Sequence, residues 1–359
     1  MIINIVTAIN LSGSGKFGSG LIKAMTAAAG FTHKVRAVNH HDTRSLDSLI
    51  QRRPSSPQVT IFLWPFLVPG FEHAFNVVGR KILWVVFETD HLPEPWINDY
   101  HKFDEIWVPS DWGRSVLIGH GLDPAKVITM PEGIDTDHYS PAPQPHDGIR
   151  FLLVGKSEMR KSIDEALLAF LAAFPDPAMP VEFWLKVDNP FFPDRGPALQ
   201  EKWKHEKRFR FLTGLMPESN MPWLYNQVDA LVFPSKAEGF GLPCIEAISC
   251  GLPVIATNYS GHSQFLNQMT GRFIPVDYKL APIEDDDYRS SYSQFYGGQA
   301  IGQWAMPDIG SIADGMRRFY DAPAIWRAHA MEAMQKVAPE FAWGAIATRA
   351  LAQLTGKKP

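Results

Sequence analysis

The sequence predicts two α/β domains, each built around a parallel β-sheet. Its 359 residues exceed what one ordinary hydrophobic core holds together, so two domains are expected. Short apolar runs alternate with stretches of helical periodicity, which is typical of βαβ units. Three prolines crowd into residues 140–148, SPAPQPHDG, and the alternation starts again after them. We interpret this stretch as a linker between the two domains.

In the first half of the chain, apolar runs rich in Val, Ile, Phe and Trp indicate strands, and stretches with helical spacing separate them. We expect strands at residues 2–9, 33–39, 58–64, 81–87 and 103–109, and helices at residues 18–30 and around 45–53.

In the second half, residues 162–174 predict an amphipathic helix with a Ser and an Asp near its start. Residues 276–303 break the rhythm, and we interpret them as a long loop or insertion. The EDDD run at 284–287 is interpreted as a solvated acidic loop and not as a metal site. We expect further strands at residues 149–155, 181–187, 208–214, 229–235 and 251–257.

The composition indicates a soluble globular protein, with 45% apolar and 20% charged residues. The net charge of −4 does not favour a nucleic-acid partner. The charge is uneven, because residues 1–81 carry nine Lys or Arg against three Asp or Glu, whereas residues 82–146 carry three against eleven. Ordinary surface variation is one reading of this pattern, and a basic face for an anionic partner or membrane headgroups is the other.

The two cysteines, Cys244 and Cys250, fit neither a zinc site nor a disulfide framework. Their apolar neighbours predict buried free thiols, which suits a reducing cytosol. No apolar run approaches the length of a membrane span, and the N-terminus shows no secretory signal, so we expect a cytoplasmic protein.

A glycine-rich stretch follows the first predicted strand. Gly13, Gly15 and Gly18 read G-x-G-x-x-G, which is the fingerprint of a dinucleotide site. Such a site needs an acid at the end of the second strand, and Asp42 comes late for that role. The stretch is not a P-loop, because Phe17 follows the lysine where Ser or Thr is required. It remains a ligand-binding loop at the carboxyl end of a strand.

The most informative segment is 232–261, where a strand ends, a loop with two glycines follows, and Pro243 suits the first turn of a helix. A helix N-terminus approached through glycines is a site for a phosphate or diphosphate. Glu238 and Glu246 flank this loop, and a diphosphate would repel them. They are therefore expected to accept hydrogen bonds from hydroxyls of a sugar or a ribose.

Glu238 and Glu246 form an E-x7-E pattern inside residues 234–257, and this segment closely resembles the donor site of retaining glycosyltransferases of the group 1 family, also called glycosyltransferase family 4. Residues 106–135, 302–320 and 341–354 resemble other segments of the same family, so the similarity covers most of the chain.

The resemblance implies the GT-B fold, in which two Rossmann-like parallel-sheet domains face each other across a cleft. Residues 1–143 would form the acceptor-side domain and residues 144–338 the nucleotide-sugar donor domain. Residues 339–359 would form a helix that packs back on the N-terminal domain.

The resemblance also implies roles for residues of the second domain. Glu238 would hold hydroxyls of the donor sugar, and Glu246 the ribose of the nucleotide. Lys156 stands where the family usually has an Arg, and Lys161 matches a family Lys, so both would neutralise the diphosphate, with Arg160 able to share that role. The backbone of the loop would bind sugar and phosphate through Gly239, Phe240, Gly241 and Leu242. The residues after Gly214 would line the nucleobase pocket, and these are Leu215 and Met216.

In the first domain, the resemblance places Gly13 and Gly15 opposite the donor diphosphate, with Lys16 adding charge. The family usually has a His at the end of the strand 81–87, where this chain has Glu88, followed by Asp90 and His91. Glu88 is a candidate for contact with the sugar or the acceptor, and a local helix cap is the alternative.

The resemblance therefore implies a retaining transferase that moves a hexosyl group from a nucleoside-diphosphate sugar to a hydroxyl of a glycan, a lipid-linked acceptor or a small molecule. No metal and no other cofactor are expected. An anionic or membrane-carried acceptor would place the protein peripherally at a membrane. Three alternatives remain: an epimerase of the same fold, a nicotinamide dehydrogenase, and a non-catalytic nucleotide-sugar-binding subunit.

Overall fold

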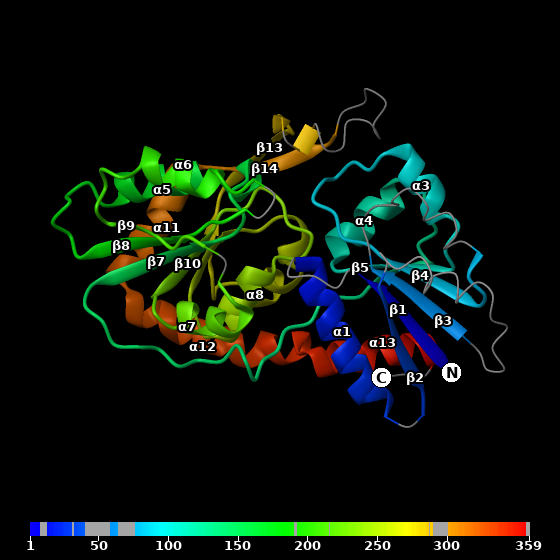
Figure 1. Cartoon of the computed structure of the whole chain (residues 1–359). Coiled ribbons are helices and arrows are strands. Elements are labelled where there is room, and N and C mark those ends of the chain that lie inside the picture. Colours follow the sequence, from blue (N-terminus) through cyan, green and yellow to red (C-terminus); the bar gives the residue numbers. More distant parts are fainter. Residues whose placement is uncertain are drawn as a thin grey trace. The chain divides into compact units, whose positions relative to one another are not determined.

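The computed structural model describes two compact units (Figure 1). Unit 1 comprises Met1–Asp135, Asp287–Gly302 and Glu340–Pro359, and unit 2 comprises Thr136–Asp286 and Gln303–Pro339. The structure describes residues 1–7, 13–30, 32–39, 58–63, 76–189, 192–214, 216–286, 288–289 and 301–356, with the backbone alone at 13–15 and 39.

Unit 1 contains a six-stranded parallel sheet in the order β2-β1-β3-β4-β5-β6. The strands are short, and the inner ones are almost fully buried, as parallel strands covered on both faces must be. Their bounds are β1 Ile2–Thr7, β2 Lys34–Asn39, β3 Gln58–Leu63, β4 Arg80–Trp84, β5 Glu105–Val108 and β6 Val127–Thr129.

Helices cover both faces of this sheet. The described helices are α1 Gly13–Ala29, α3 Glu94–Tyr100, α4 Asp111–Gly119, η6 Ala338–Phe341 and α13 Trp343–Thr355, of which η6 is a 3₁₀-helix that begins in unit 2. Helices α1 and α13 lie side by side on one face (Figure 1), and α3 and α4 pack on the other. Trp343 of α13 fits against Gly20 of α1, where an added Cβ would lie 2.4 Å from its ring.

Unit 2 contains a second six-stranded parallel sheet, in the order β12-β11-β10-β7-β8-β9, and a separate antiparallel pair of β13 and β14. The strand bounds are β7 Ile149–Val154, β8 Val181–Lys186, β9 Phe209–Phe211, β10 Ala230–Phe233, β11 Val254–Thr257, β12 Ile274–Val276, β13 Tyr278–Pro282 and β14 Gln303–Pro307.

The helices of unit 2 include two long ones near its end and several short turns that follow strands. Their bounds are η2 Met159–Lys161, α5 Ile163–Ala173, α6 Arg195–Lys202, η3 Glu218–Asn220, α7 Met221–Tyr225, α8 Leu242–Ser249, η4 Ser260–His262, α9 Ser263–Leu266, η5 Asn267–Met269, α11 Ile309–Asp321 and α12 Pro323–Val337.

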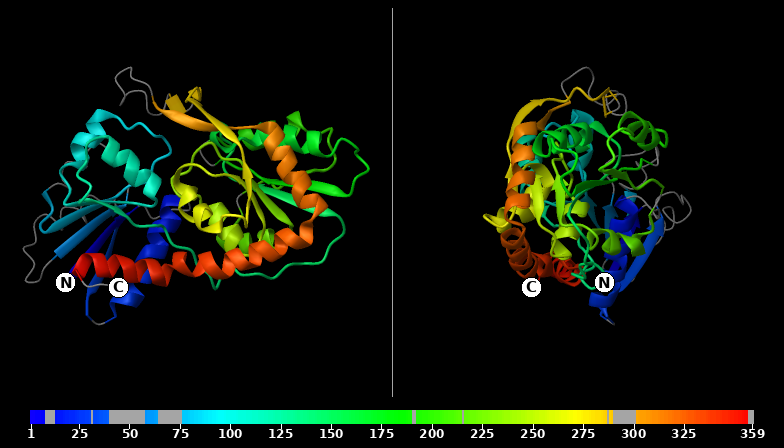
Figure 2. Two further views of the ribbon diagram at one scale, coloured as in Figure 1. Left: turned by 180° about the vertical axis from the view of Figure 1, so that it is seen from behind. Right: turned by 90° about the vertical axis from the view of Figure 1, so that its left-hand side faces the viewer.

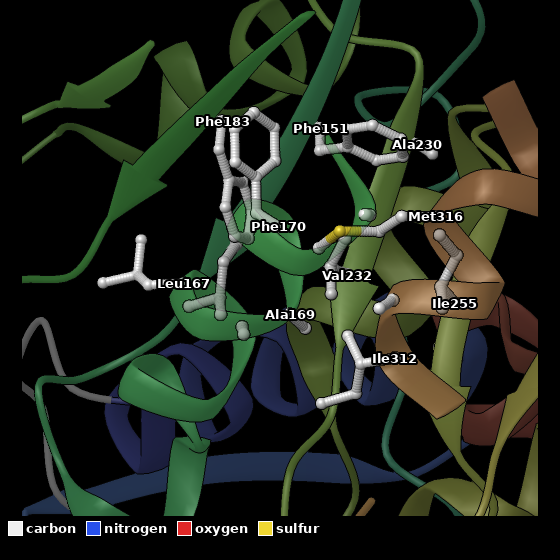
Figure 3. Packing of buried hydrophobic residues seen from close by; sticks show 14 of the residues in the cluster. Phe151, Leu167, Ala169, Phe170, Phe183, Ala230, Val232, Ile255, Ile312 and Met316 are labelled. Carbon is white, nitrogen blue, oxygen red and sulfur yellow. The ribbon is translucent and has the colours of Figure 1, made fainter. Parts of the chain in front are cut away.

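The main core of unit 2 lies where α5 and α11 run beside each other on one face of the sheet (Figure 2). Phe170 of α5 stacks on Phe183 of β8 with ring centroids 5.6 Å apart, and Met316 of α11 points into the same cluster (Figure 3). Such interlocking aromatic and aliphatic side chains fix the sheet and so fix the loops at its carboxyl edge.

The strands predicted for both halves are present within the described ranges. Helix α1 begins at Gly13, five residues earlier than predicted, because glycine is tolerated in a first turn and a Cβ at Gly18 would lie 2.2 Å from Thr7 Oγ1, which brings helix and strand close. The prediction of one long loop at 276–303 is wrong in part, because residues 278–282 pair with residues 303–307. The helix predicted around 45–53 lies outside the described residues.

Residues 140–148, predicted as a linker between the two domains, are irregular and lie within unit 2, which begins at Thr136. The Ala142 amide donates to Asn226 Oδ1 at 2.6 Å, and the Gln144 amide to the Asn226 carbonyl at 3.0 Å. Within the described ranges, none of the helices combines the length and the apolar character that crossing a bilayer requires.

Candidate functional site

The loop between β10 and α8 forms the centre of the candidate site in unit 2. It runs from Pro234 to Gly241, and every residue in it is buried. Gly241 has a φ of +94°, and a Cβ there would lie 2.8 Å from the Cβ of His262. Glycine is needed for both reasons, and it turns the chain directly into α8. The predicted loop and helix start are confirmed.

The neighbouring loop residues bring backbone to the start of α8. Phe240 is 2% exposed and packs edge to face on Phe265, with ring centroids 5.5 Å apart. Gly239 lies so close to Gly261 that a Cβ on Gly261 would be 2.0 Å from the Gly239 carbonyl oxygen. Leu242 is half-buried at the first turn of the helix, where the backbone amides lack partners within the helix.

Glu238 is the buried anion of this loop, and two cations face it. Lys161 Nζ lies 2.5 Å from its Oε1, and Arg160 Nη1 lies 3.1 Å from its Oε2, with all three side chains less than 10% exposed. Burial alone would raise the pKa of Glu238, but the charges of Lys161 and Arg160 hold that pKa well below its usual range. The carboxylate is therefore ionised and already hydrogen-bonded.

The cations reach Glu238 because the loop after β7 and the loop after β10, both at the carboxyl edge of the sheet, are hydrogen-bonded to each other. Arg160 and Lys161 belong to η2, after β7, and β7 is the direct neighbour of β10. The Lys236 amide donates to the Arg160 carbonyl at 2.8 Å, and Arg160 Nη1 donates to the Ala237 carbonyl at 2.6 Å. The predicted convergence of residues 156–161 with the loop after β10 is thus present in unit 2.

Further charges surround this cluster. Lys156 is 41% exposed and lies 3.6 Å from Glu158, which also pairs with Arg160. The positive charges of Arg160, Lys156 and Lys161 outweigh burial and lower the pKa of Glu158. Around Glu238, three cations therefore face two carboxylates, which leaves one excess positive charge for an anionic ligand.

The loop after β11 supports Glu238 from behind. The Glu238 amide donates to Ser260 Oγ at 2.8 Å, and the Gly261 amide donates to the Glu238 carbonyl at 2.9 Å. His262 is fully buried with Nε2 2.7 Å from the Thr257 carbonyl, and its Nδ1 has no hydrogen-bond partner in the described part of the chain. Burial lowers the pKa of His262 to about 4, so its ring is neutral at pH 7.

Glu246 lies in the second turn of α8 and is 5% exposed. Its Oε2 accepts a hydrogen bond of 2.7 Å from the hydroxyl of Tyr225, the last residue of α7. The hydroxyl of Tyr139 donates to Glu218, and it is also influenced by Glu246, which with burial raises the pKa of that phenol. Glu246, the residue predicted to bind the ribose, is thus one member of a network of two phenols and two carboxylates.

Gly214, which precedes the predicted nucleobase pocket, is held by the end of β8. Its carbonyl accepts a hydrogen bond of 2.8 Å from Lys186, and its amide donates to Asp188 Oδ1 at 3.0 Å. Its φ of +91° turns the chain. Met216 is half-buried, and Leu215 lies outside the described residues.

In unit 1, two carboxylates lie near the carboxyl edge of the sheet. Glu88 follows β4 and is half-buried, and Glu132 follows β6 and is 5% exposed. Burial, reinforced by the negative charge of Glu88, raises the pKa of Glu132 to about 8. Helix α3 begins after Pro93, so Glu88 is not its cap. Thr89 donates to the Ile301 carbonyl at 2.5 Å.

The other predicted site residues of unit 1 are described in part. Gly13 and Gly15 form the first turn of α1, and Lys16 is exposed on it.

Both cysteines of unit 2, Cys244 and Cys250, are buried and free, as predicted, and burial raises the pKa of both thiols. Among the residues that the structure describes, no three His, Cys, Asp or Glu side chains are grouped so that they could hold a metal ion.

Residues 198–277, which include Glu238 and Glu246, match the family model of the glycosyl transferases group 1. This segment of the chain is therefore similar to the group 1 glycosyltransferases. The resemblance inferred from the E-x7-E segment is thereby confirmed.

Two curated relatives match part of the chain. It is 36% identical over 144 residues to the O-antigen chain mannosyltransferase B of Escherichia coli, covering 38% of each protein. It is 29% identical over 162 residues to the D-inositol 3-phosphate glycosyltransferase of Mycobacterium leprae strain Br4923, covering 42% of this chain and 37% of the relative. The chain therefore spans well under half the length of these two curated relatives.

The fold matches over almost the whole chain. The crystal structure of Anabaena HepE in complex with UDP superposes with a TM-score of 0.72 at 13% identity, covering 99% of both chains. Together with the two parallel six-stranded sheets, this likeness confirms the predicted GT-B fold.

The sequence alone did not indicate three buried residues of the candidate site. Lys236 is 2% exposed and its Nζ lies 2.8 Å from Glu165 of α5, so it holds the loop after β10 against that helix. His262 and Tyr225 were also missed. The one available signal was a lysine inside an otherwise buried loop, because burial of a lysine requires a partner carboxylate.

Proposed function

We propose that this chain is a retaining hexosyltransferase that moves a sugar from a nucleoside-diphosphate sugar to a hydroxyl acceptor. The observation that carries the proposal is the buried cluster of Glu238, Lys161 and Arg160 beside the start of α8. Glu238 lies within the segment 198–277 that matches the group 1 family model. The relatives named as a mannosyltransferase and an inositol phosphate glycosyltransferase support a hexosyl group, and the HepE complex with UDP supports a nucleotide donor.

The chemistry follows from the charges. When the bond between sugar and diphosphate breaks, negative charge grows on the leaving diphosphate. The excess cation around Lys156, Arg160 and Lys161 and the amides at the start of α8 would stabilise that charge, and such electrostatic stabilisation is usually the largest catalytic contribution. Glu238, ionised and fixed, would accept hydrogen bonds from hydroxyls of the donor sugar.

Thermal unfolding with a panel of UDP-glucose, UDP-N-acetylglucosamine, GDP-mannose and ADP-glucose tests donor binding. A ligand at 100 times its Kd adds about 2.7 kcal/mol of stability, which shifts the melting temperature measurably. Lys156→Ala should weaken the binding of the active nucleotide sugar about tenfold. Lys202→Ala, which removes an exposed lysine of the same unit, is the matched control. If no nucleotide sugar of the panel shifts the melting temperature, the proposal fails.

Retention of the anomeric configuration is the second part of the proposal, and the group 1 resemblance supports it. The mechanism expected from that resemblance is attack on the face that the diphosphate leaves, with the leaving phosphate taking the proton of the acceptor. NMR of the first product formed distinguishes the outcomes, because an α-linked donor gives an α-linked product under retention. A β-linked product would overturn retention and leave donor binding intact.

We further propose that transfer needs no divalent metal, because lysine, arginine and the helix N-terminus already supply positive charge at the diphosphate position. Activity should then persist in EDTA. Loss of transfer in EDTA with recovery in Mg²⁺ or Mn²⁺ would contradict this.

The acceptor is proposed to bind unit 1, and the basic residues 1–81 would orient it if it is anionic or carried by a membrane lipid. Arg36 on β2 is half-buried, and Arg44, Arg52 and Arg53 lie outside the described residues. Reversing the charge of Arg52 and Arg53 should raise the KM for the acceptor and not for the donor, and the effect should shrink in high salt because screening acts over about 8 Å. A change in the donor KM alone would contradict this role.

A further inference from the structure

Two tyrosines of unit 2 surround the carboxylate that the proposed function assigns to the ribose. Tyr225 is 1% exposed and Tyr139 is 3% exposed, so both phenols are buried. Their ring centroids lie 6.1 Å apart, and each hydroxyl donates to a carboxylate, Tyr225 to Glu246 and Tyr139 to Glu218. A buried phenol needs such an acceptor, and here both acceptors are carboxylates.

The backbone fixes both tyrosines independently of their hydroxyls. Tyr225 ends α7, and the main chain of Tyr139 accepts a hydrogen bond of 2.7 Å from Ser249 Oγ at the end of α8. The rings therefore hold their positions relative to α8, the helix that carries Glu246. The Tyr225 hydroxyl is left to orient the Glu246 carboxylate directly, and Tyr139 supports it through the neighbouring ring of Tyr225.

A phenol suits this task because it is a neutral donor. It fixes one oxygen of Glu246 without cancelling the negative charge, so the carboxylate can accept further hydrogen bonds on its remaining lone pairs. The 2.7 Å bond from Tyr225 occupies Oε2 in this way. A ribose presents two neighbouring hydroxyls, which need an ionised acceptor held in one orientation.

Tyr139 extends the network to the chain that follows β9. Its partner Glu218 begins η3, four residues after Gly214, and the Gly214 end is clamped by Lys186 and Asp188. The segment between is thus attached at one end to β8 and at the other to the phenol beside Glu246.

We propose that Tyr225 and Tyr139 are positioning residues that hold Glu246 in the orientation that binds the two ribose hydroxyls of a nucleoside diphosphate. This inference rests on the proposed function, because it assigns the two phenols to the nucleotide half of that same site.

The test compares nucleotides with and without the two hydroxyls. The affinities of UDP, GDP and ADP and of their 2′,3′-dideoxy counterparts are measured by calorimetry on the unsubstituted chain and on Tyr225→Phe, Tyr139→Phe and Glu246→Gln. In the unsubstituted chain, removing both hydroxyls should weaken the best of the three nucleotides roughly 10- to 100-fold, as expected for hydrogen bonds to a charged group.

The ratio of the ribonucleotide affinity to the dideoxynucleotide affinity should fall to within about threefold in Tyr225→Phe. The ribonucleotide should bind more weakly, while the dideoxynucleotide binds as before. Tyr139→Phe should reduce the ratio less, because Tyr225 still holds Oε2. Glu246→Gln should bind the ribonucleotide and the dideoxynucleotide with similar affinity, since it removes the charged acceptor. Tyr320→Phe, a phenol of α11 in the same unit, is the matched control and should leave the ratio unchanged.

A phenol-to-benzene exchange keeps the ring, and the melting temperature of each variant confirms that it folds. If Tyr225→Phe is folded and its ratio equals that of the unsubstituted chain, the inference is wrong and the proposed function stands. If Glu246→Gln keeps the ratio, the ribose does not meet Glu246 and the inference is likewise wrong. If none of the three nucleotides binds the unsubstituted chain, the proposed function fails and the inference fails with it.

Discussion

Lys161 and Lys202 each pair with a carboxylate in unit 2, and their surroundings decide what the pairs contribute. Lys161 and its partner Glu238 are each 7% exposed, whereas Lys202 and its partner Asp164 are 57% and 50% exposed. An exposed pair contributes little because water and salt screen it. A buried pair that loses one member leaves a charge without compensation.

Lys161→Met should therefore destabilise unit 2 by about 3 kcal/mol, the low end for a broken buried pair because Arg160 still faces Glu238. Lys202→Met should cost less than about 1 kcal/mol. Urea unfolding of the two variants measures the difference. Equal losses would mean that the buried pair contributes no more than the surface pair.

Glu132 gives unit 1 a dependence on pH. Its folded pKa is about 8 against an ordinary 4.5, so between these values the folded chain keeps a proton that the unfolded chain has lost. Stability then falls as pH rises through this window, by about 4 kcal/mol from pH 5 to pH 8. Glu132→Gln should remove this loss and so raise the melting temperature at pH 8 more than at pH 5. Glu201→Gln, an exposed control, should shift neither.

The sequence predicted Glu238 and Glu246 because they flank a local glycine loop at a helix start, and the group 1 resemblance added Lys156 and Lys161. It did not predict the residues that hold them. Lys236 contacts Glu165, Tyr225 contacts Glu246, and His262 lies against Gly241, so each acts on a segment more than 20 residues away. Nothing in the sequence next to these residues indicates that they are buried. Such long-range contacts form only when the sheet is assembled.

The turn from β10 into α8 is the element on which the site depends. Gly241 combines a positive φ with a close approach to His262, whereas Gly271 has a φ of +78° and no atom within 4 Å of an added Cβ. Replacing Gly271 would add backbone strain alone, whereas replacing Gly241 would add backbone strain and a steric conflict. Comparing the two substitutions therefore separates these effects within one unit.

Gly271→Ala should cost about 1–2 kcal/mol, the strain of a left-handed residue alone. Gly241→Ala should cost more, roughly 2–4 kcal/mol, because the loop must also shift away from His262. That shift moves the start of α8, so Gly241→Ala should also weaken nucleotide-sugar binding, as calorimetry with the donor would show. If both variants lose the same stability and keep the same affinity, His262 does not support the loop.

Helices and strands with a strong hydrophobic periodicity were predictable from the sequence. Strands that are defined by pairing with another strand were not. The strands of both parallel sheets stand out as apolar runs, but β6 and β12 are three residues long and carry no pattern of their own. The β13–β14 pair joins segments on either side of residues 283–302, and β13 is mostly exposed, so its strand character depends on β14. Helix α1 began earlier than predicted because glycine is poor inside a helix but acceptable in its first turn.

At the scale of the whole molecule, each unit has its own hydrophobic core, so each is expected to unfold with its own transition. Gly20→Ala should lower only the transition of unit 1, by about 1–3 kcal/mol, because its new methyl group would overlap the ring of Trp343. Lys161→Met should lower only that of unit 2. Calorimetry of both variants checks this. A single transition that moves equally in both variants would show that the units unfold together.

Helix α13 has a consequence for how the chain is made. Domains that emerge from a ribosome usually fold in order, with the N-terminal one first. Here unit 1 needs residues 340–359, which are synthesised after all of unit 2, and Ile346 and Ala350 of α13 pack against Phe17 of α1 in one core. Until those residues emerge, the part of α1 that contacts α13 is uncovered while unit 2 can already fold. The part of the molecule that is translated first is thus the part that closes last, and during that interval a chaperone would find its binding surface on α1.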